Sequence, residues 1–232
     1  MSGAQVYPTG NSHTPLTFAD DWLVLDVGSG HKPHPRADVL ADRYIQDDTE
    51  RSGQLIVAPI DKLLVQADGA ALPFARKTFD FVICSHVLEH VPPESLAAFC
   101  RELDRVAKAG YIETPSKWAE WLRHAPNHRW FVSLSKGVLT FVPTPSGYPL
   151  GWFGKLFFSL YFYGTIQVQG RDVFAFSQGV RKPWHYLFAL LRLGLVKLWL
   201  SAHSLTYTRL HWRDHFEYQI RGFQDGSEHA EG

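Results

Sequence analysis

The sequence predicts an α/β fold with a mostly parallel sheet, because short apolar runs dominate its first half and one amphipathic helix lies between the last two. The runs are four to six residues long and rich in β-branched side chains, as is typical of strands buried on both faces of a parallel sheet. A strand, a helix and another strand in this order predict a right-handed crossover. The predicted strands are residues 22–27, 38–41, 63–67, 80–84 and 111–114.

The predicted helix separates the fourth strand from the fifth. Pro92 and Pro93 suit its first turn, where the backbone N–H that proline lacks would have no partner within the helix. Gly110 is typical of the position just after a helix ends. The apolar stripe of this helix consists of Leu96, Phe99, Cys100, Leu103, Val106 and Ala107.

The composition is that of a globular protein without a strong overall charge. Lys plus Arg and Asp plus Glu both number 23 in the 232 residues, so no net charge indicates a nucleic-acid partner. The two cysteines, Cys84 and Cys100, argue against a disulfide framework and favour the cytoplasm. We expect no signal peptide, since the N-terminus lacks a basic start and an apolar run. We expect no transmembrane helix, since no uncharged apolar stretch reaches about 18 residues.

The residues VLDVGSG at 24–30 form the first candidate ligand site. An acidic residue, Asp26, stands near the end of a predicted strand, and Gly28 and Gly30 follow in the turn. Glycines permit backbone angles and a close backbone approach to a ligand that a Cβ would forbid. A ligand could then lie across the carboxyl end of the sheet, where open α/β sheets bind. A tight structural turn explains the same residues equally well.

Two further carboxylates follow predicted strands. Asp42 comes after the second strand, where it could accept hydrogen bonds from both hydroxyls of a ribose or remain a solvated charge. Asp68 comes after the third strand, where it could accept a hydrogen bond from an exocyclic amine while Leu72 packs against the ring. The fourth strand brings Ser85 and His86 to the same edge of the sheet. For Glu89 and His90, just beyond it, we expect a capping or packing role at the start of the helix.

Four segments in order resemble the motif series of class I S-adenosylmethionine-dependent methyltransferases, in particular those of methyltransferase type 11. The segments are VLDVGSG, DGAALPF, FDFVICSHVLEHV and ELDRVAKAGYIETPS, within residues 20–116. The most specific part of this resemblance is the succession of the segments LPF, FD and LEHV. The resemblance implies a Rossmann-like, mostly parallel sheet with a closing antiparallel strand. Such sheets usually have seven strands, of which 205–210 and 216–220 would be the last two.

The resemblance also implies S-adenosylmethionine as the cofactor and a role for each motif. Asp26, Gly28, Ser29 and Gly30 would line its amino-acid part. The resemblance assigns the ribose to Asp42, the adenine to Asp68, Gly69 and Leu72, and the methionine side to Ser85 and His86. The expected organisation is an arm at 1–20, the cofactor-binding core at 21–116, an insertion over the acceptor at 117–203, a closing strand pair at 204–222 and a flexible tail at 223–232.

Two departures from the family pattern affect the first turn. Lys32 replaces the usual third glycine, and only ten residues separate Val27 from Asp38. A parallel crossover normally needs about a dozen residues and a helix, so we expect the first helix to be reduced to a turn. A nicotinamide-binding Rossmann fold is disfavoured, because Pro33 stands where its sixth motif position requires glycine and Asp42 comes too early.

Methyl transfer to a hydroxyl requires a group that removes a proton, and three residues are candidates. His128 is the preferred base, because it follows the fifth strand and its ordinary pKa is near neutrality. His86 and Glu113 also lie near the carboxyl edge of the sheet. Arg129 could orient an anionic acceptor or pair with a carboxylate, and Trp130 is a candidate for acceptor binding.

The twelve histidines suggest a metal site, but their pattern does not support one. His86 and His90 are four residues apart, as are His124 and His128, which is a spacing that metal ligands on a helix use. However, the sequence has no HExxH motif and no cysteine pair beside them. We therefore expect the histidines to be unrelated and no metal to bind.

The insertion is rich in aromatic residues and precedes the last two predicted strands. A hairpin is expected at 130–142 around Ser135–Gly137, and apolar helices are expected at 152–163 and 184–200. These helices would pack against each other and the sheet, form a homodimer interface, or contact a membrane surface peripherally.

The sequence thus predicts a methyltransferase that acts on a small-molecule, sugar or lipid-linked acceptor, with oxygen favoured as the acceptor atom. Two other classes of protein remain open. One is a non-catalytic module that uses the methyltransferase fold to bind a partner. The other is a nucleotide-sugar or nicotinamide enzyme, for which a second phosphate-binding loop would be expected.

Overall fold

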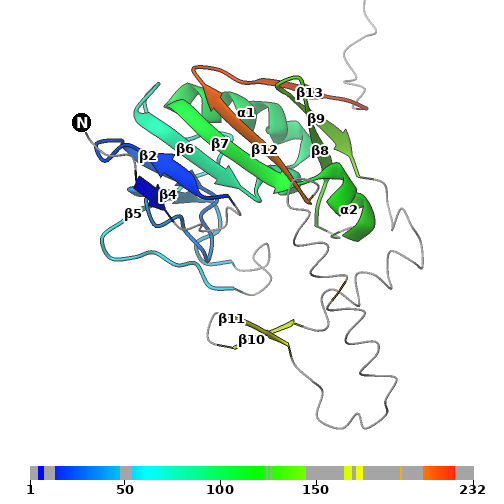
Figure 1. Ribbon diagram of the computed structural model, residues 1–232. Coiled ribbons are helices and arrows are strands. Elements are labelled where there is room, and N and C mark those ends of the chain that lie inside the picture. The colour runs from blue at the N-terminus through cyan, green and yellow to red at the C-terminus, as the bar shows by residue number, and fades with distance from the viewer. Residues whose placement is uncertain are drawn as a thin grey trace, which may run out of the picture. The chain divides into compact units, whose positions relative to one another are not determined.

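Figure 1 shows the computed structural model of the protein. The chain forms two compact units. The first unit comprises Met1–Pro115, Asn127–Thr144 and Thr208–Gly232, and the second comprises Ser116–Pro126 and Pro145–Tyr207. The described residues are 5–7, 14–47, 54–123, 125, 127–144, 165–168, 171–174, 194 and 206–222.

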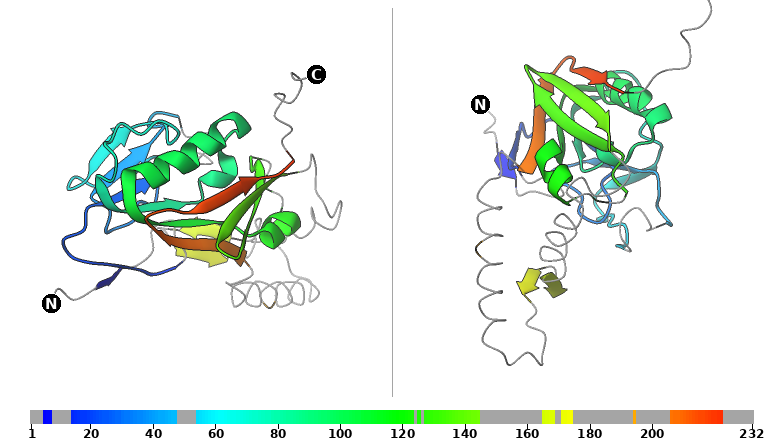
Figure 2. Two further views of the ribbon diagram at one scale, coloured as in Figure 1. Left: turned by 90° about the horizontal axis from the view of Figure 1, so that it is seen from above. Right: turned by 90° about the vertical axis from the view of Figure 1, so that its right-hand side faces the viewer.

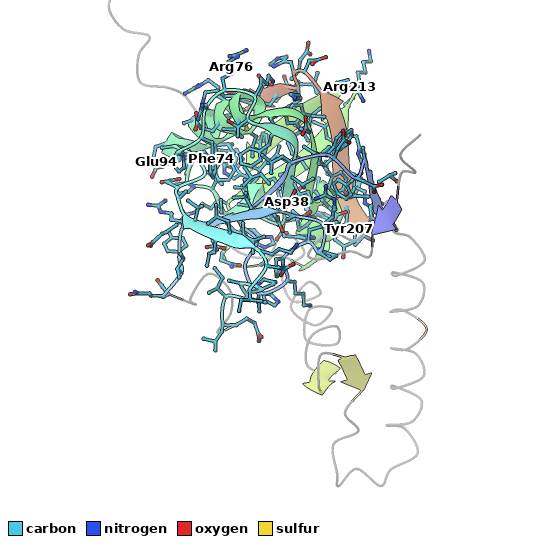
Figure 3. The ribbon with its side chains drawn as sticks, turned by 90° about the vertical axis from the view of Figure 1, so that its left-hand side faces the viewer. Asp38, Phe74, Arg76, Glu94, Tyr207 and Arg213 are labelled. Atoms are coloured by element: carbon cyan, nitrogen blue, oxygen red, sulfur yellow. The ribbon has the colours of Figure 1, made fainter. Side chains whose placement is uncertain are left out.

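A six-stranded sheet in the order β12-β7-β6-β3-β4-β5 forms the centre of the first unit. The five strands from β3 to β7 are mutually parallel, and β12 runs against β7, as the arrows in Figure 1 show. This arrangement confirms the predicted α/β, Rossmann-like class. The strands are β3 (Val24–Val27), β4 (Val39–Asp42), β5 (Leu63–Gln66), β6 (Phe79–Ser85), β7 (Ala107–Pro115) and β12 (Tyr207–Arg213), whose two end residues are labelled in Figure 3.

Helix α1 (Pro93–Val106) lies on one side of this sheet, as Figure 2 shows, and buries its predicted stripe. The helix ends earlier than expected and continues directly into β7, so Gly110 lies within the strand. A Cβ on Gly110 would come within 2.7 Å of the Trp212 ring, which explains the glycine by close packing. Lys77, from the loop before β6, caps the C-terminus of the helix. Its Nζ donates to the carbonyl oxygens of Asp104 at 2.7 Å and Ala107 at 2.8 Å.

The two faces of the sheet have separate cores, because successive residues of a strand point to opposite sides. Leu25 belongs to the core that α1 covers, whereas Val24 belongs to the other. On this second face Phe18 packs edge-to-face against Phe81, with ring centroids 5.3 Å apart. Phe18 belongs to the short β2 (Leu16–Phe18), which pairs with β1 (Gln5–Tyr7). The predicted arm at 1–20 therefore contains a segment that covers the second face of the sheet.

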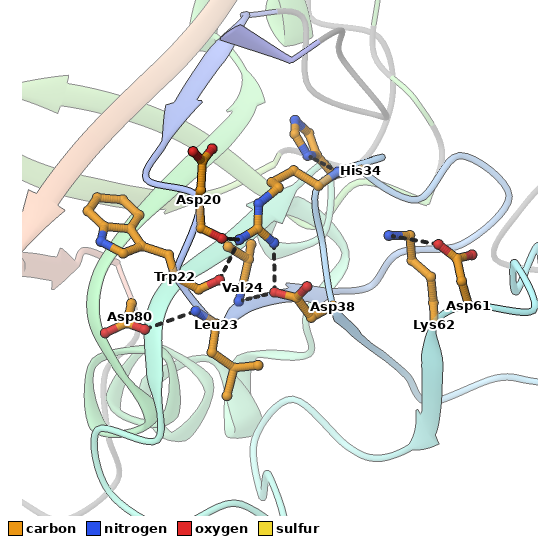
Figure 4. Close-up of polar contacts among 10 residues, drawn as sticks. Asp20, Trp22, Leu23, Val24, His34, Asp38, Asp61, Lys62 and Asp80 are labelled. Atoms are coloured by element: carbon orange, nitrogen blue, oxygen red, sulfur yellow. Dashed lines mark hydrogen bonds and ion pairs between the residues drawn. The ribbon is translucent and has the colours of Figure 1, made fainter. Parts of the chain in front are cut away.

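The chain between β3 and β4 contains no helix, which confirms the predicted reduction of the first helix to a turn. Arg36 holds this connection in place. Its guanidinium donates to Asp38 Oδ2 at 2.8 Å and to the carbonyl oxygen of Trp22 at 2.5 Å, and Figure 4 labels these two partners. Asp38 Oδ2 also accepts from the backbone N–H of Val24 at 2.8 Å. These contacts tie the start of β4 to the start of β3 without a crossover helix.

The predicted hairpin is present as β8 (Trp130–Ser135) and β9 (Val138–Pro143), which are antiparallel. Lys136 and Gly137 form its turn with φ of 50° and 83°, as a two-residue turn with left-handed residues requires.

Strand β13 (Glu217–Ile220) lies parallel to β9 in a separate three-stranded sheet, not next to β12. The expected closing pair is therefore divided between two sheets, and the described main sheet has six strands instead of seven. Asp214, with φ of 65°, and a bridge between Arg213 and His215 redirect the chain at this point.

The second unit contains α2 (Lys117–Arg123) and the antiparallel strands β10 (Thr165–Val168) and β11 (Arg171–Phe174). The helices expected at 152–163 and 184–200 lie outside the described residues, apart from Gly194. Within the described residues, no helix has the length and apolar character needed to cross a membrane.

Candidate functional site

The predicted glycine turn follows β3 and adopts the conformation that requires glycine. Gly28 and Gly30 have φ of 71° and 55°, and the N–H of Gly28 donates to the carbonyl oxygen of Ala41 at 2.7 Å. A Cβ on Gly28 would lie 2.3 Å from Cγ2 of Val87. Both the backbone angle and the close approach of Val87 therefore require glycine at position 28. Through these contacts the turn after β3 touches β4 and the segment after β6.

Asp26 is a buried carboxylate directly before this turn. Its Oδ2 accepts from the backbone N–H of His34 at 2.8 Å. Burial raises the pKa of Asp26 from 3.8 to about 7, with a smaller increase from the charge of Asp42, and the His34 hydrogen bond opposes the shift only in part. Asp26 is thus poised to change its charge near neutral pH.

His34 is buried beside Asp26 and remains neutral. Burial lowers its pKa from 6.5 to about 4, and the positive charges of Lys62 and Arg36 contribute further. Its Nδ1 accepts from the backbone N–H of Arg36 at 3.2 Å, and its ring packs against Phe18 at a centroid distance of 5.2 Å. The ring therefore fixes the loop whose N–H is directed at Asp26.

Asp42 and Asp68 end or follow the neighbouring strands, as predicted. Asp42 Oδ2 accepts from the N–H of Gly30 at 3.0 Å, and its Oδ1 accepts from the N–H of Tyr44 at 3.0 Å. Asp68 Oδ1 accepts from the N–H of Ala70 at 2.9 Å, and its Oδ2 lies 3.3 Å from Arg43 Nη1. The carboxyl ends of β3, β4 and β5 thus each bear one carboxylate.

Gly69 and Leu72, expected to contact an adenine, are accounted for by packing. A Cβ on Gly69 would lie 2.1 Å from Cε2 of Phe99 in α1. Leu72 is 4% exposed within the core on the α1 side, and its N–H donates to Glu102 Oε2 at 2.7 Å. The apolar residues of this loop therefore hold it against α1.

Strand β6 delivers Ser85 and His86 to the same edge of the sheet. Ser85 is buried, and its Oγ has no hydrogen-bond partner among the residues that the structure describes. Ser29, in the glycine turn, is also buried. His86 has φ of 57°, a left-handed conformation that is uncommon outside glycine, asparagine and aspartate, and its N–H donates to the carbonyl oxygen of Glu113 at 2.8 Å. Pairing with β7 thus holds the turn in this conformation.

The His86 ring lies between two buried carboxylates. Its Nδ1 is 3.3 Å from Glu89 Oε1, and its Nε2 is 3.4 Å from Glu113 Oε1. Burial acts to lower the pKa of His86, but the hydrogen bonds and charges of Glu113 and Glu89 outweigh it and raise the pKa to about 9. His86 is therefore an imidazolium at neutral pH and cannot accept a proton from a substrate.

Glu113 is fully buried and is the centre of a second set of contacts. Its Oε2 accepts from Tyr111 Oη at 2.5 Å, from Arg209 Nε at 3.0 Å and from Thr14 Oγ1 at 3.4 Å. Together with His86, these donors come from β6, β7, β12 and the N-terminal segment. Donors from four parts of the chain therefore converge on this one carboxylate.

Glu89, His90 and His128 gather beside His86. Glu89 and His90 belong to the short 3-10 helix η2 (Leu88–His90), and His128 precedes β8. The rings of His90 and His128 are perpendicular with centroids 4.6 Å apart. Burial acts to raise the pKa of Glu89, but the hydrogen bond and charge of His86, with smaller effects of His90 and His128, leave that pKa below its ordinary value. The histidines expected to be unrelated are therefore neighbours here.

The structure gives other contacts for Arg129 and Trp130, which the sequence suggested as acceptor-binding residues. Trp130 is 1% exposed, its Nε1 donates to the carbonyl oxygen of Val91 at 2.7 Å, and its ring packs edge-to-face on Phe141. It is a core residue, because it begins β8 on the side that faces the main core. Arg129 Nε donates to the carbonyl oxygen of His90 at 3.1 Å, so this side chain holds η2 in place.

The contacts of three residues in the site were not predicted, and their sequence signals differ. Tyr111 lies two positions before the predicted Glu113 on one strand and so shares its face, a relation that the sequence contains. Arg209 reaches Glu113 across 96 positions of the chain, and no local pattern indicates such a contact. Glu89 lies in the motif LEHV, but its burial depends on the chain around His128 folding over it.

The family described as a methyltransferase domain matches residues 39–112. The matched stretch begins in β4 and ends within β7. It includes Asp42, Asp68, His86 and Glu89, and the glycine turn lies before it.

Three solved structures are similar to this chain at low identity. The YcgJ protein from Bacillus subtilis is 19% identical with a TM-score of 0.35, over 46% of this chain and 54% of its own. The PH0226 protein from Pyrococcus horikoshii is 20% identical with a TM-score of 0.35, over 60% of this chain and 72% of its own. A SAM-dependent methyltransferase from Methanosarcina mazei is 16% identical with a TM-score of 0.35, over 51% of this chain and 69% of its own.

The chain thus spans about half the length of the first of these proteins. No curated protein matches it. The family match over residues 39–112 confirms the resemblance to class I methyltransferases that the sequence motifs predict.

Proposed function

We propose that the protein transfers the methyl group of S-adenosylmethionine to an oxygen atom of a small-molecule, sugar or lipid-linked acceptor. The observation that carries this proposal is the row of carboxylates at the ends of three adjacent parallel strands. Asp26, Asp42 and Asp68 occupy this row, and the latter two lie within the stretch that matches the methyltransferase family. The carboxyl edge of an open α/β sheet is where such folds bind ligands.

The residues at this edge fit the cofactor. Asp42 accepts a backbone hydrogen bond on each oxygen, and a carboxylate at the end of this strand is the type of group that accepts hydrogen bonds from ribose hydroxyls. Ser85 Oγ is a buried polar atom without a hydrogen-bond partner in the described part of the chain, which a polar ligand group would satisfy. Asp26, once ionised, would pair with the ammonium group of the methionine part.

The acceptor side of the proposal rests on the charge states of the site. The cofactor, when bound, supplies a methyl group on a positively charged sulfur, and the protein must orient the acceptor hydroxyl and help remove its proton. His86 is already protonated, and Glu113 is surrounded by donors. Of the three predicted bases, His128 is therefore the one we assign to the acceptor hydroxyl, next to His90 and the buried Glu89.

Calorimetric titration with S-adenosylmethionine and S-adenosylhomocysteine tests the cofactor assignment. We expect saturable binding of both ligands to the full chain, weakened about tenfold or more in Asp42→Ala and Asp68→Ala, since each variant loses a charge-assisted hydrogen bond. Asp61→Ala is the matched control, because Asp61 is an exposed carboxylate whose ion pair is with the adjacent Lys62. Absence of binding by the folded wild-type protein would refute the enzyme assignment and favour the non-catalytic partner module.

A further inference from the structure

Three side chains that commonly ligate metals meet beside the proposed acceptor site. One ligand atom from each of Glu89, His90 and His128 lies within 4.8 Å of the other two. All three residues belong to the first unit, and η2, which carries two of them, follows the carboxyl end of β6. Two imidazoles and one carboxylate form a common ligand set for a divalent metal that keeps open coordination positions.

The burial of Glu89 distinguishes this cluster from an ordinary acidic surface. Its side chain is 1% exposed, and its Oε2 has no hydrogen-bond partner among the residues that the structure describes. His86 Nδ1 lies 3.3 Å from Oε1. A buried carboxylate is costly unless charges and hydrogen bonds compensate it, and a cation held together with His90 and His128 would add to the compensation that His86 provides.

The contact of His90 with a backbone carbonyl fixes the tautomer of its ring. Its Nδ1 lies 3.3 Å from the carbonyl oxygen of Asn127. A carbonyl can only accept, so Nδ1 carries the proton and Nε2 presents its lone pair. A histidine ligand usually donates its second ring N–H to such a carbonyl or carboxylate, which fixes the tautomer and the orientation of the ring.

Backbone contacts hold the segment of His128 against η2. The N–H of Arg129 donates to the carbonyl oxygen of Glu89 at 2.7 Å, and Arg129 Nε donates to that of His90 at 3.1 Å. Thr144 Oγ1 donates to the carbonyl oxygen of His128 at 2.8 Å. The backbone that carries the three side chains is therefore anchored, and their ligand atoms lie within 4.8 Å of one another, compared with about 3.4 Å around a tetrahedral ion.

We propose that Glu89, His90 and His128 bind one divalent transition-metal ion through a carboxylate oxygen and two imidazole nitrogens. His86 is a positioning residue in this site, since its Nδ1 pairs with Glu89 Oε1 at 3.3 Å. Three protein ligands leave at least one coordination position for water or a substrate oxygen.

The consequence for chemistry rests on the proposed methyltransferase function. A divalent ion lowers the pKa of a hydroxyl that it binds, which removes the need for a strongly basic side chain. The O–H bond of the acceptor breaks and its proton passes to water, and a C–O bond forms to the methyl group. The bond between methyl carbon and sulfur breaks with its electron pair left on sulfur. In this arrangement His128 acts on the acceptor hydroxyl through the metal.

Metal binding can be measured without cofactor or acceptor, on the full chain freed of any polyhistidine tag and of metal. We expect Zn²⁺ to bind with a stoichiometry of one at this site and Co²⁺ to give a visible absorption spectrum typical of nitrogen and oxygen ligation. His90→Ala and His128→Ala should each weaken Zn²⁺ binding at least about tenfold and abolish the Co²⁺ spectrum. His215→Ala is the matched control, because His215 is an exposed histidine that pairs with Asp104 at 3.0 Å.

Thermal unfolding keeps the test independent of folding defects. Zn²⁺ should raise the Tm of the wild-type protein and of His215→Ala, but not of His90→Ala or Glu89→Gln, whatever the Tm of each metal-free variant. Zn²⁺ binding that is unchanged in both histidine variants, or absent from the wild type, would overturn the proposal. Titration of S-adenosylmethionine in the presence of a chelator tests the proposed function separately, so the two failures are distinguishable.

Discussion

The backbone N–H of His34 donates to the buried Oδ2 of Asp26 at 2.8 Å, and this contact joins two groups whose pKa values are displaced toward the neutral form of each. The pKa of Asp26 rises to about 7, whereas that of His34 falls to about 4. Both residues lie at the start of the proposed cofactor site. Burial therefore favours the neutral form of both residues.

The two groups make opposite contributions to the pH dependence of stability. Folding takes up a proton at Asp26 between pH 3.8 and about 7, so its contribution falls as pH rises through that window. Folding releases a proton from His34 between pH 6.5 and about 4, so its contribution rises with pH. We expect the two slopes largely to cancel between about pH 4 and 6.5 in the wild-type protein.

Substitution of either residue should expose the slope of the other. The free energy of unfolding, measured in urea, should rise with pH in Asp26→Asn and fall with pH in His34→Asn, with slopes approaching 1.4 kcal/mol per pH unit. Asparagine retains a hydrogen-bond acceptor in both cases, since its amide oxygen can replace Oδ2 of Asp26 or Nδ1 of His34. Parallel pH profiles for the two variants would contradict the assigned charge states.

Cofactor affinity should depend on the charge of Asp26. If the ammonium group of S-adenosylmethionine pairs with this carboxylate, binding requires Asp26 to ionise, so affinity should increase as pH rises toward about 7 and then level off. Calorimetry in buffers of different ionisation enthalpy should detect the released proton below pH 7. Asp26→Asn should bind more weakly at pH 8 and without proton release. A wild-type affinity that does not change between pH 5.5 and 8 would exclude this pairing.

The ion pair of Arg209 with Glu113 should be worth much more than a surface pair. Glu113 is fully buried, so Arg209→Met leaves a charged carboxylate without its nearest cation, and we expect a loss of about 3 kcal/mol in unfolding free energy. Glu113→Gln in the same chain should recover part of that loss, because it removes the unpaired charge. Equal stability of the Arg209→Met single variant and the double variant would show that the pair is not coupled.

Lys77 should contribute more to stability than a lysine in an exposed pair. Its Nζ donates to three carbonyl oxygens, those of Asp104, Ala107 and Asp214, within 2.9 Å. Lys77→Met should therefore lower the unfolding free energy by about 2 kcal/mol. Lys108→Met is the control: Lys108 forms an exposed pair with Asp80, and its loss should cost less than about 1 kcal/mol. Similar losses in the two variants would contradict a capping role for Lys77.

The sequence predicts the parts of the fold that depend on local periodicity. Short apolar runs rich in β-branched residues identify β3, β4, β5, β6 and β7, and a helical stripe identifies α1. The sequence does not predict that Phe18 covers the second face of the sheet, because Phe18 contacts Phe81, which is far along the chain. It also misplaces β13, whose partner is decided by a bend at Asp214.

In the candidate site, too, local patterns are predictable from the sequence and contacts between distant parts of the chain are not. The positions of Asp26, Asp42, Asp68 and Ser85 are predictable, because parallel strands end at one edge. The environment of His86 is not, since its two carboxylates come from η2 and β7 and their burial depends on tertiary packing. Trp130, which the sequence suggested as an acceptor-binding residue, begins β8 and packs in the core.

The crystal structure of the full chain with S-adenosylhomocysteine tests the central claim most directly. We predict that the ligand lies across the carboxyl ends of β3, β4 and β5, with its ribose hydroxyls within about 3 Å of Asp42 and its adenine amine within about 3 Å of Asp68. A ligand bound elsewhere on the molecule, or contacts that leave both carboxylates unused, would contradict the account.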